Sequence, residues 1–205
     1  MSQLESDLAK FYDQQAPRRA KMRPDERRDG ARSDFVALLQ SEGRSSVLEI
    51  GTGTGRDSAA LQAAGLAVTG IDLSSENVRH CRELGIDYHQ GSLFEMPFED
   101  GAFEAGWTMS TLLHVPNDQI DDALRRVAGV LAPGAPIAIG VLGGRDSEET
   151  LEEDRFEPKR FFSHRSDGTL RRILERFGTI ERFETWPAPT RDDEHYQYCV
   201  LRTLS

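Results

Sequence analysis

The residues best suited to chemistry lie in one glycine-rich segment and in an acid that follows it. Three glycines alternate from Gly51 to Gly55, directly after the apolar run 47–50. Alternating glycines let the backbone turn tightly and let a ligand approach bare main-chain N–H groups. Asp72 ends a second strand-like run, 66–71, where its carboxylate can accept from both hydroxyls of a ribose. These features predict a site for a ribose-bearing ligand.

The charge of the ligand is indicated by an acid inside the first apolar run. Glu49 lies where an unpaired carboxylate is costly, and a cationic group on the ligand would relieve that cost. A dinucleotide fingerprint would need its third glycine at position 56, where this chain has Arg56. The ligand is therefore expected to carry a ribose and a positive charge but no pyrophosphate, and a NAD-linked oxidoreductase is disfavoured.

His114 is the histidine whose position indicates chemistry. It follows a predicted strand over 103–108, at the edge where open parallel sheets bind ligands. Imidazole titrates near neutrality and can serve as a general base. The alternative is a structural histidine that binds a loop carbonyl or caps the next helix.

Alternating strand and helix patterns position these residues. Apolar runs predict strands over 47–50, 66–71, 86–90, 103–108 and 137–142, with two last strands over 179–186 and 196–204. Helical spacing predicts helices over 3–15, from near Asp25 to Gly43, and over 58–64, 74–84, 117–131 and 167–177, with Pro17 ending or bending the first of them. This order is typical of an α/β fold.

Two charged segments flank this core. Residues 143–157 are strongly acidic and are expected to form a mobile, solvated loop above the site. The basic cluster within 18–32 alternates with acids and is interpreted first as a solvated helix face. The second interpretation is a cap in which Tyr12 and one arginine lie near the carboxylate of a cofactor or near an anionic substrate.

Bulk properties restrict the partners. A chain of 205 residues is long enough for one domain with a full core, and its net charge of −10 argues against a nucleic-acid backbone as partner. No apolar stretch reaches membrane-spanning length, and the first residues lack the pattern of a signal peptide. Cys81 and Cys199 have no metal-binding spacing and are expected to be buried free thiols in the cytoplasm. No metal site is expected.

The segment 47–57, followed by Asp72, Leu73 and Ser74, resembles the first two motifs of class I S-adenosylmethionine-dependent methyltransferases. The resemblance spans roughly residues 46–142. It implies an α/β, three-layer Rossmann-like methyltransferase fold with a mostly parallel seven-stranded sheet, a C-terminal antiparallel strand pair and an N-terminal helical lid. The expected single domain divides into the lid over 1–44, a cofactor-binding core over 45–142 and a substrate side over 143–205.

The resemblance also implies S-adenosylmethionine as cofactor and assigns residues to it. The cofactor-binding residues that we expect are Tyr12, Glu49, Gly51, Thr52, Gly53, Asp57, Asp72, Leu73, Asn77, Ser92, Leu93, Thr108 and Met109. The loop 91–98 resembles the loop that holds the adenine in the family, which commonly has an acid where this chain has Ser92. His114 is expected to act as the base, and His114, Phe161 and His164 are expected to contact the substrate.

The function expected from this resemblance is transfer of a methyl group to an oxygen or nitrogen nucleophile of a small molecule, by a monomer or homodimer. Two alternatives stay open at the level of sequence. A nucleic-acid methyltransferase shares the core, although it usually needs a broad basic surface or an added domain. A cofactor-binding module without catalysis is also compatible, because nothing after residue 142 is diagnostic of a substrate.

Overall fold

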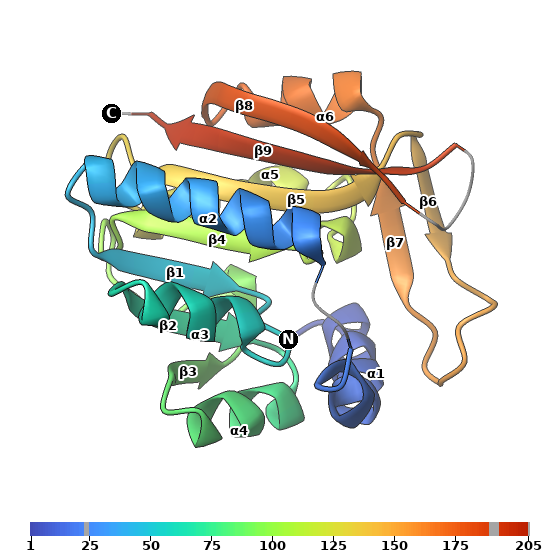
Figure 1. The fold of residues 1–205 in the computed structure, drawn as a ribbon. Helices are drawn as coiled ribbons and strands as arrows, with labels where there is room; N and C mark the ends of the chain where they lie inside the picture. The colour runs from blue at the N-terminus through green and yellow to red at the C-terminus, as the bar shows by residue number, and fades with distance from the viewer. Residues whose placement is uncertain (23–24, 189–192, 205) are drawn as a thin grey trace.

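A seven-stranded sheet forms the centre of the computed structural model, which describes residues 1–22, 25–188 and 193–204. The strands lie in the order β3-β2-β1-β4-β5-β9-β8 (Figure 1). Their bounds are β1 Ser46–Ile50, β2 Ala67–Asp72, β3 Asp87–Gln90, β4 Ala105–Met109, β5 Pro136–Gly143, β8 Gly178–Pro187 and β9 His195–Thr203. Strands β1 to β5 are parallel, and β9 runs antiparallel to both β5 and β8, which confirms the predicted fold class.

The register of the parallel strands brings the predicted site residues to one edge. Ile50 of β1 lies opposite Ile71 of β2 and Thr108 of β4. The three strands therefore end together, and the segments that begin at Gly51, Asp72 and Met109 leave the sheet side by side. Strand ends that meet in this way form the crevice in which open α/β sheets bind ligands.

Helices cover both faces of the sheet. On one face lie α2 Glu26–Ser41, α3 Arg56–Ala63 and α4 Ser75–Glu83, and on the other lie α5 Ile120–Val130 and α6 Asp167–Leu174 (Figure 1). Phe35 and Leu39 of α2 pack with the fully buried Trp107 of β4, while Leu124 of α5 and Leu174 of α6 belong to the cluster on the opposite face. The result is the three-layer arrangement that was expected.

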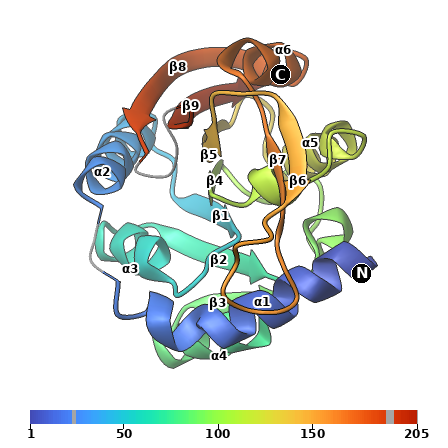
Figure 2. The same cartoon turned by 90° about the vertical axis from the view of Figure 1, so that its right-hand side faces the viewer.

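Helix α1, Gln3–Arg19, lies across the carboxyl ends of the strands (Figure 2). A capping box in which Ser2 and Glu5 bind each other's backbone N–H starts the helix. The sequence predicted that Pro17 ends or bends this helix, whereas α1 continues to Arg19. The proline removes one N–H near the C-terminus, and the next turn still closes because Ala20 donates to the Ala16 carbonyl at 3.0 Å.

The docking of α1 depends on one carboxylate of the helix. Asp13 accepts from the Ser74 hydroxyl at 2.6 Å and from the Glu76 backbone N–H at 3.0 Å, which places its negative charge at the N-terminus of α4. Anions at a helix N-terminus are stabilising. The side chains of Leu8 and Phe11, which belong to α1, are buried. The helix is thus fixed over the edge of the sheet where Gly51 and Asp72 lie.

The acidic segment over 143–157 is not a solvated loop throughout. Strand β6, Ser147–Thr150, pairs antiparallel with β7, Phe161–His164, in a hairpin that lies in front of α1 in Figure 2. The acids in and beside this hairpin find basic partners: Glu149 pairs with Arg145, and Asp154 pairs with Arg160 at 2.6 Å. These counter-charges lie within the segment or directly after it, and their pairing with the acids explains why the segment is not solvated throughout.

Two further expectations concern the membrane and the cysteines. Over the described ranges, every helix is too short or too polar to cross a bilayer. Cys81 and Cys199 are both buried and free, as expected. Burial raises the pKa of each thiol to about 12, so both behave as small apolar groups at neutral pH.

Candidate functional site

A cavity of about 860 Å³, measured to its open mouth, lies between the strand ends and α1. This volume includes open solvent at the mouth of the cavity. The residues that the sequence analysis assigned to the cofactor or substrate and that line this cavity are Tyr12, Gly51, Gly53, Asp72, Leu73, Asn77, Leu93, Met109 and His114. Segments from four strand ends and from α1 therefore meet at one ligand-sized space.

Asp72 lies at the centre of this set, and backbone donors hold its carboxylate in place. The Gly53 N–H donates to Oδ2 at 2.9 Å, and the Ser74 N–H donates to Oδ1 at 2.8 Å. Burial raises the pKa of Asp72, and these two N–H groups oppose the increase. The Asn77 side-chain amide also donates to Oδ1, at 3.4 Å. Because a carboxylate has about four acceptor positions, about one remains for a hydroxyl group of a ligand.

The glycine turn approaches the cavity closely. Gly51 has a φ of +73°, and a Cβ at this position would overlap the side chain of Thr111. Gly53 has a φ of +54° and faces open space. A backbone without side chains, next to a fixed carboxylate that can accept hydroxyl protons, can accommodate a ribose-bearing ligand.

Glu49 is enclosed on β1 and is 1% exposed. Ser58 donates a hydrogen bond to its carboxylate, and burial, followed by the nearby charge of Asp57, raises the pKa of Glu49 to about 8. Glu49 is therefore protonated at neutral pH unless a cation lies beside it. Its predicted contact with a positively charged ligand group stays a prediction.

The raised pKa of Glu49 predicts a pH-dependent stability. A carboxyl whose pKa is higher in the folded chain than in the unfolded chain stabilises the fold at low pH, and this contribution is lost as pH rises through about 8. The wild-type free energy of unfolding should fall by on the order of 2 kcal/mol between pH 6 and pH 9 through this group. Glu49→Gln should remove that decrease in chemical denaturation.

Glu104→Gln provides the matched control for this experiment. The backbone N–H of Ser45 is the first of several donors that lower the pKa of Glu104, so Glu104 is ionised in both states over this pH range. The control variant should therefore follow the wild-type pH dependence. Equal slopes for wild type and Glu49→Gln would show that Glu49 does not carry the effect.

Asp57 was predicted to bind the cofactor, but the structure gives it partners within the protein. Arg28 donates to one carboxylate oxygen at 2.7 Å, Arg32 donates to the other at 2.6 Å, and the Trp107 indole N–H donates at 2.9 Å. Burial alone would raise the pKa of Asp57, but the arginine charges and the donated hydrogen bonds outweigh burial. The pKa of Asp57 is therefore lower than its usual value. The expectation that the basic cluster is a solvated face is thus wrong for Arg28 and Arg32, which tie α2 to α3.

Tyr12 and His114 form a hydrogen-bonded pair at the wall of the cavity. The Tyr12 Oη lies 2.6 Å from Nε2 of His114, and Nδ1 of His114 lies 2.8 Å from the carbonyl oxygen of Phe161. A carbonyl can only accept, so Nδ1 carries the proton of the neutral imidazole. Nε2 is then the acceptor, and the Tyr12 hydroxyl donates to it.

Burial changes the acid–base behaviour expected of His114. Loss of solvent lowers its pKa to about 3, so the imidazole does not titrate near neutrality as the sequence analysis assumed. The structural alternative expected a loop carbonyl as its partner, whereas the carbonyl that it binds belongs to Phe161, the first residue of β7. The same bond leaves a neutral nitrogen that fixes the hydroxyl of Tyr12 at the cavity.

The β7 residues predicted to contact substrate lie beside the cavity wall. Phe161 reaches His114 through its carbonyl, and the ring that packs on His114 is that of Phe162, at 4.8 Å between centroids. His164 stacks on the other side of Phe162 at 5.6 Å. Neither Phe161 nor His164 belongs to the described residues that line the cavity, so their contact with a substrate stays a prediction.

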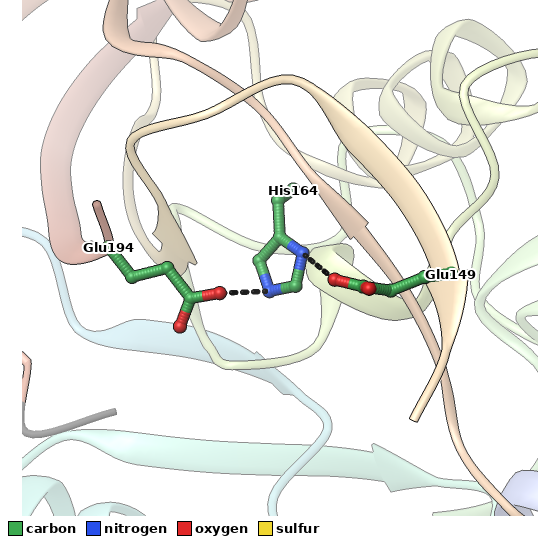
Figure 3. Close-up of side chains that lie close together, drawn as sticks. All are labelled: Glu149, His164 and Glu194. Carbon is green, nitrogen blue, oxygen red and sulfur yellow. Dashed lines mark ion pairs between the residues drawn. The ribbon is translucent and has the colours of Figure 1, made fainter. Parts of the chain in front are cut away.

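His164 instead lies between two carboxylates, as Figure 3 shows. Its Nδ1 is 3.6 Å from Glu149, and its Nε2 is 3.7 Å from Glu194. The three side chains could in principle bind a metal, since their ligand atoms lie within 4.8 Å of one another. However, the Arg145 guanidinium already donates to both carboxylates and supplies the positive charge that an ion would supply. We assign this group to holding the hairpin against β9.

Several of the predicted cofactor-binding residues do not line the cavity, and several unpredicted residues do. Glu49, Thr52, Ser92 and Thr108 are buried and, like Asp57, do not belong to the described residues that line the cavity. Leu4, Glu5 and Leu8 of α1 line the cavity and were not predicted, because a cavity wall on a separate helix depends on where that helix docks. Arg19 lines the cavity together with Tyr12, as the second interpretation of the basic cluster allowed.

Known proteins resemble this chain in sequence and in fold. Residues 47–134 match the model of a methyltransferase domain family. The 1,6-didemethyltoxoflavin-N1-methyltransferase of Burkholderia thailandensis, solved with S-adenosylhomocysteine, has a TM-score of 0.67 at 21% identity, over 90% of this chain and 92% of that chain.

Curated relatives match about half of this chain. A ubiquinone biosynthesis O-methyltransferase of Xanthomonas campestris is 32% identical over 118 residues, which cover 54% of this chain and 48% of that protein. A botryococcene C-methyltransferase of Botryococcus braunii is 30% identical over 115 residues, 52% of this chain and 30% of that protein. The chain thus matches less than half the length of these relatives, whose names show that the methyltransferase domain serves different acceptors.

Proposed function

We propose that this chain is an S-adenosylmethionine-dependent methyltransferase that acts on a nitrogen or oxygen nucleophile of a small molecule. The observation that carries the proposal is the carboxylate of Asp72, fixed by the Gly53 and Ser74 N–H groups at a cavity that also exposes Gly51. This arrangement suits a ribose beside a bare backbone turn. Asn77 and Leu73, which line the same end, support the placement.

The chemistry requires little of the protein beyond orientation. When bound, the cofactor supplies a methyl group already activated on a sulfonium sulfur. The residues of the chain need to hold the acceptor in line and to exclude water, and such positioning can contribute about 7–11 kcal/mol to lowering the barrier. His114 fixes the Tyr12 hydroxyl, whose free lone pair can accept a hydrogen bond from the N–H or O–H of an acceptor.

The covered cavity supports a small acceptor. The Gln14 side chain of α1 donates to the Glu157 carbonyl at 2.7 Å, and the Arg160 guanidinium lies over the rings of both Phe11 and Phe162. These contacts join α1 to the β6–β7 hairpin above the site. In addition, Arg28 and Arg32 are engaged by Asp57 and are not available to phosphates. Both observations favour a small molecule over a nucleic-acid strand.

Calorimetry tests the cofactor part of the proposal. Titration of the full chain with S-adenosylhomocysteine should give one-site binding, and NAD⁺ at the same concentration should give none. Absence of binding by S-adenosylhomocysteine would refute the proposal.

The acceptor is tested by incubating the chain and S-adenosylmethionine with panels of phenols and amines, or with bulk tRNA, and measuring S-adenosylhomocysteine. Release with a member of the small-molecule panels is the expected result. Release with bulk tRNA alone would overturn the small-molecule part and leave the cofactor part intact.

A further inference from the structure

We propose that Glu5 of α1 is the carboxylate that recognises the amino group of the adenine. The inference rests on the proposed function, because it concerns how this chain would bind the adenosyl part of S-adenosylmethionine. It assigns to the N-terminal helix a recognition role that the loop after β3 does not provide. The loop contains Ser92 at the position in question, and a hydroxyl is a weaker acceptor than a carboxylate.

The position of the adenine follows from Asp72. With the ribose at this carboxylate, the base extends along the cavity past Leu73 toward Gly91 and Leu93, all of which line it. The first part of α1 lines the same cavity through Leu4, Glu5 and Leu8. The hydrogen bond from Ser92 places Glu5 beside the loop that contains Gly91 and Leu93, so an adenine at this loop would lie within reach of the Glu5 carboxylate.

Ser92 is itself directed toward Glu5. Its hydroxyl donates to Oε1 of Glu5 and accepts from the Phe94 backbone N–H at 3.0 Å. Ser92 is buried, and its single proton is already used. The loop therefore positions the carboxylate of Glu5 instead of supplying one.

The carboxylate of Glu5 is fixed and still has free acceptor capacity. Its Oε2 accepts from the Ser2 backbone N–H at 2.7 Å, and its Oε1 accepts from Ser92. A carboxylate has about four lone-pair positions, so about two remain for an amino donor. Glu5 is half-buried, which strengthens a hydrogen bond to its charge relative to one in open water.

The test compares two probes that differ at this group. S-Adenosylhomocysteine carries the 6-amino group, whereas S-inosylhomocysteine carries an oxygen there and a proton on the neighbouring N1, a second difference that is the same for every variant compared. In calorimetry on the full chain, the wild type should prefer S-adenosylhomocysteine by about tenfold or more, since a carboxylate attracts an amino group and repels a carbonyl. Glu5→Gln should lose most of that preference, because its amide can donate to the oxygen of S-inosylhomocysteine.

Glutamine is the informative substitution because it preserves the helix start. A capping box accepts Glu or Gln at this position, so α1 should remain folded and docked. Asp7→Ala, a change of one acid on the same helix, is the control and should keep the wild-type preference. Ser92→Asp in the Glu5→Gln background returns a carboxylate to the loop and should restore the preference.

The outcomes separate the two proposals. An unchanged ratio of the two affinities in Glu5→Gln would overturn the role of Glu5 and leave the proposed function standing. Failure of the wild type to bind either probe would instead refute the proposed function. Loss of the preference in Asp7→Ala as well would attribute the effect to the charge of α1 in general and would also overturn the inference.

Discussion

Asp72→Ala is expected to weaken the binding of S-adenosylhomocysteine by between about tenfold and about a hundredfold. Hydrogen bonds to a charged group contribute roughly 1.5–3 kcal/mol, and each 1.4 kcal/mol corresponds to about a factor of ten in affinity. The variant loses the acceptor for the ribose hydroxyls, and it also leaves the Gly53 and Ser74 N–H groups without their partner. The measurement is a calorimetric titration at constant salt, with circular dichroism to verify the fold.

Asp87→Ala serves as the control for the lost charge. Asp87 lies at the start of β3, with a side chain that is 70% exposed, so its removal changes the net charge equally and should leave the affinity unchanged. A second comparison uses the 2′-deoxy analogue of S-adenosylhomocysteine. The wild type should bind this analogue more weakly than the parent, and Asp72→Ala should bind both alike. Wild-type affinity in a folded Asp72→Ala would remove Asp72 from the ribose site.

The part of the site that could be predicted from sequence depends on short-range chemistry and on one rule of topology. The glycine turn after β1 and the acid at the end of β2 are local patterns. The rule that parallel strands present their carboxyl ends at one edge was enough to bring Gly51, Asp72 and Met109 together. No knowledge of side-chain packing was needed for these residues.

The remaining part depends on contacts between segments that are distant in sequence. Asp57 has the same local sequence whether it binds a ligand or two arginines of α2, and only the packing of α2 over α3 decides between them. In the same way, the acids over 143–157 were predicted to be solvated because partners such as the Ser166 backbone N–H, which donates to Asp146, cannot be assigned without the folded chain. The sequence therefore shows which residues are charged, but it does not show which of them pair with one another.

His114 shows the same limit for acid–base chemistry. Its position after β4 was informative, because it does line the cavity. Its pKa depends on α1 and β7, which enclose the ring through Tyr12 and Phe162 and remove the solvent that would stabilise an imidazolium. The sequence analysis placed His114 correctly at the cavity but wrongly expected it to titrate near neutrality. The burial of His114 depends on the packing of α1 and β7, which the sequence does not show.

The second large effect is expected for turnover in Tyr12→Phe and His114→Ala. Each variant should lower the rate of S-adenosylhomocysteine release, with the acceptor found in the panel, by about 100-fold or more, within the range for groups that position or transfer a proton. S-Adenosylhomocysteine affinity should change less than the rate in each variant. Tyr12→Phe keeps the ring that packs against Phe11 and removes only the hydroxyl that donates to Nε2.

The double variant and the pH profile distinguish a working pair from two independent residues. If His114 acts by fixing the Tyr12 hydroxyl, the double variant should be no slower than the slower single variant. Since the pKa of His114 is about 3, it stays neutral from pH 5 to pH 8, and no step in the rate near pH 6.5 should depend on it. A step there that disappears in His114→Ala would show a solvated, titrating base and contradict the pair. Wild-type turnover in His114→Ala would leave the histidine a purely structural role, in which it holds the Phe161 carbonyl and thereby the hairpin above the site.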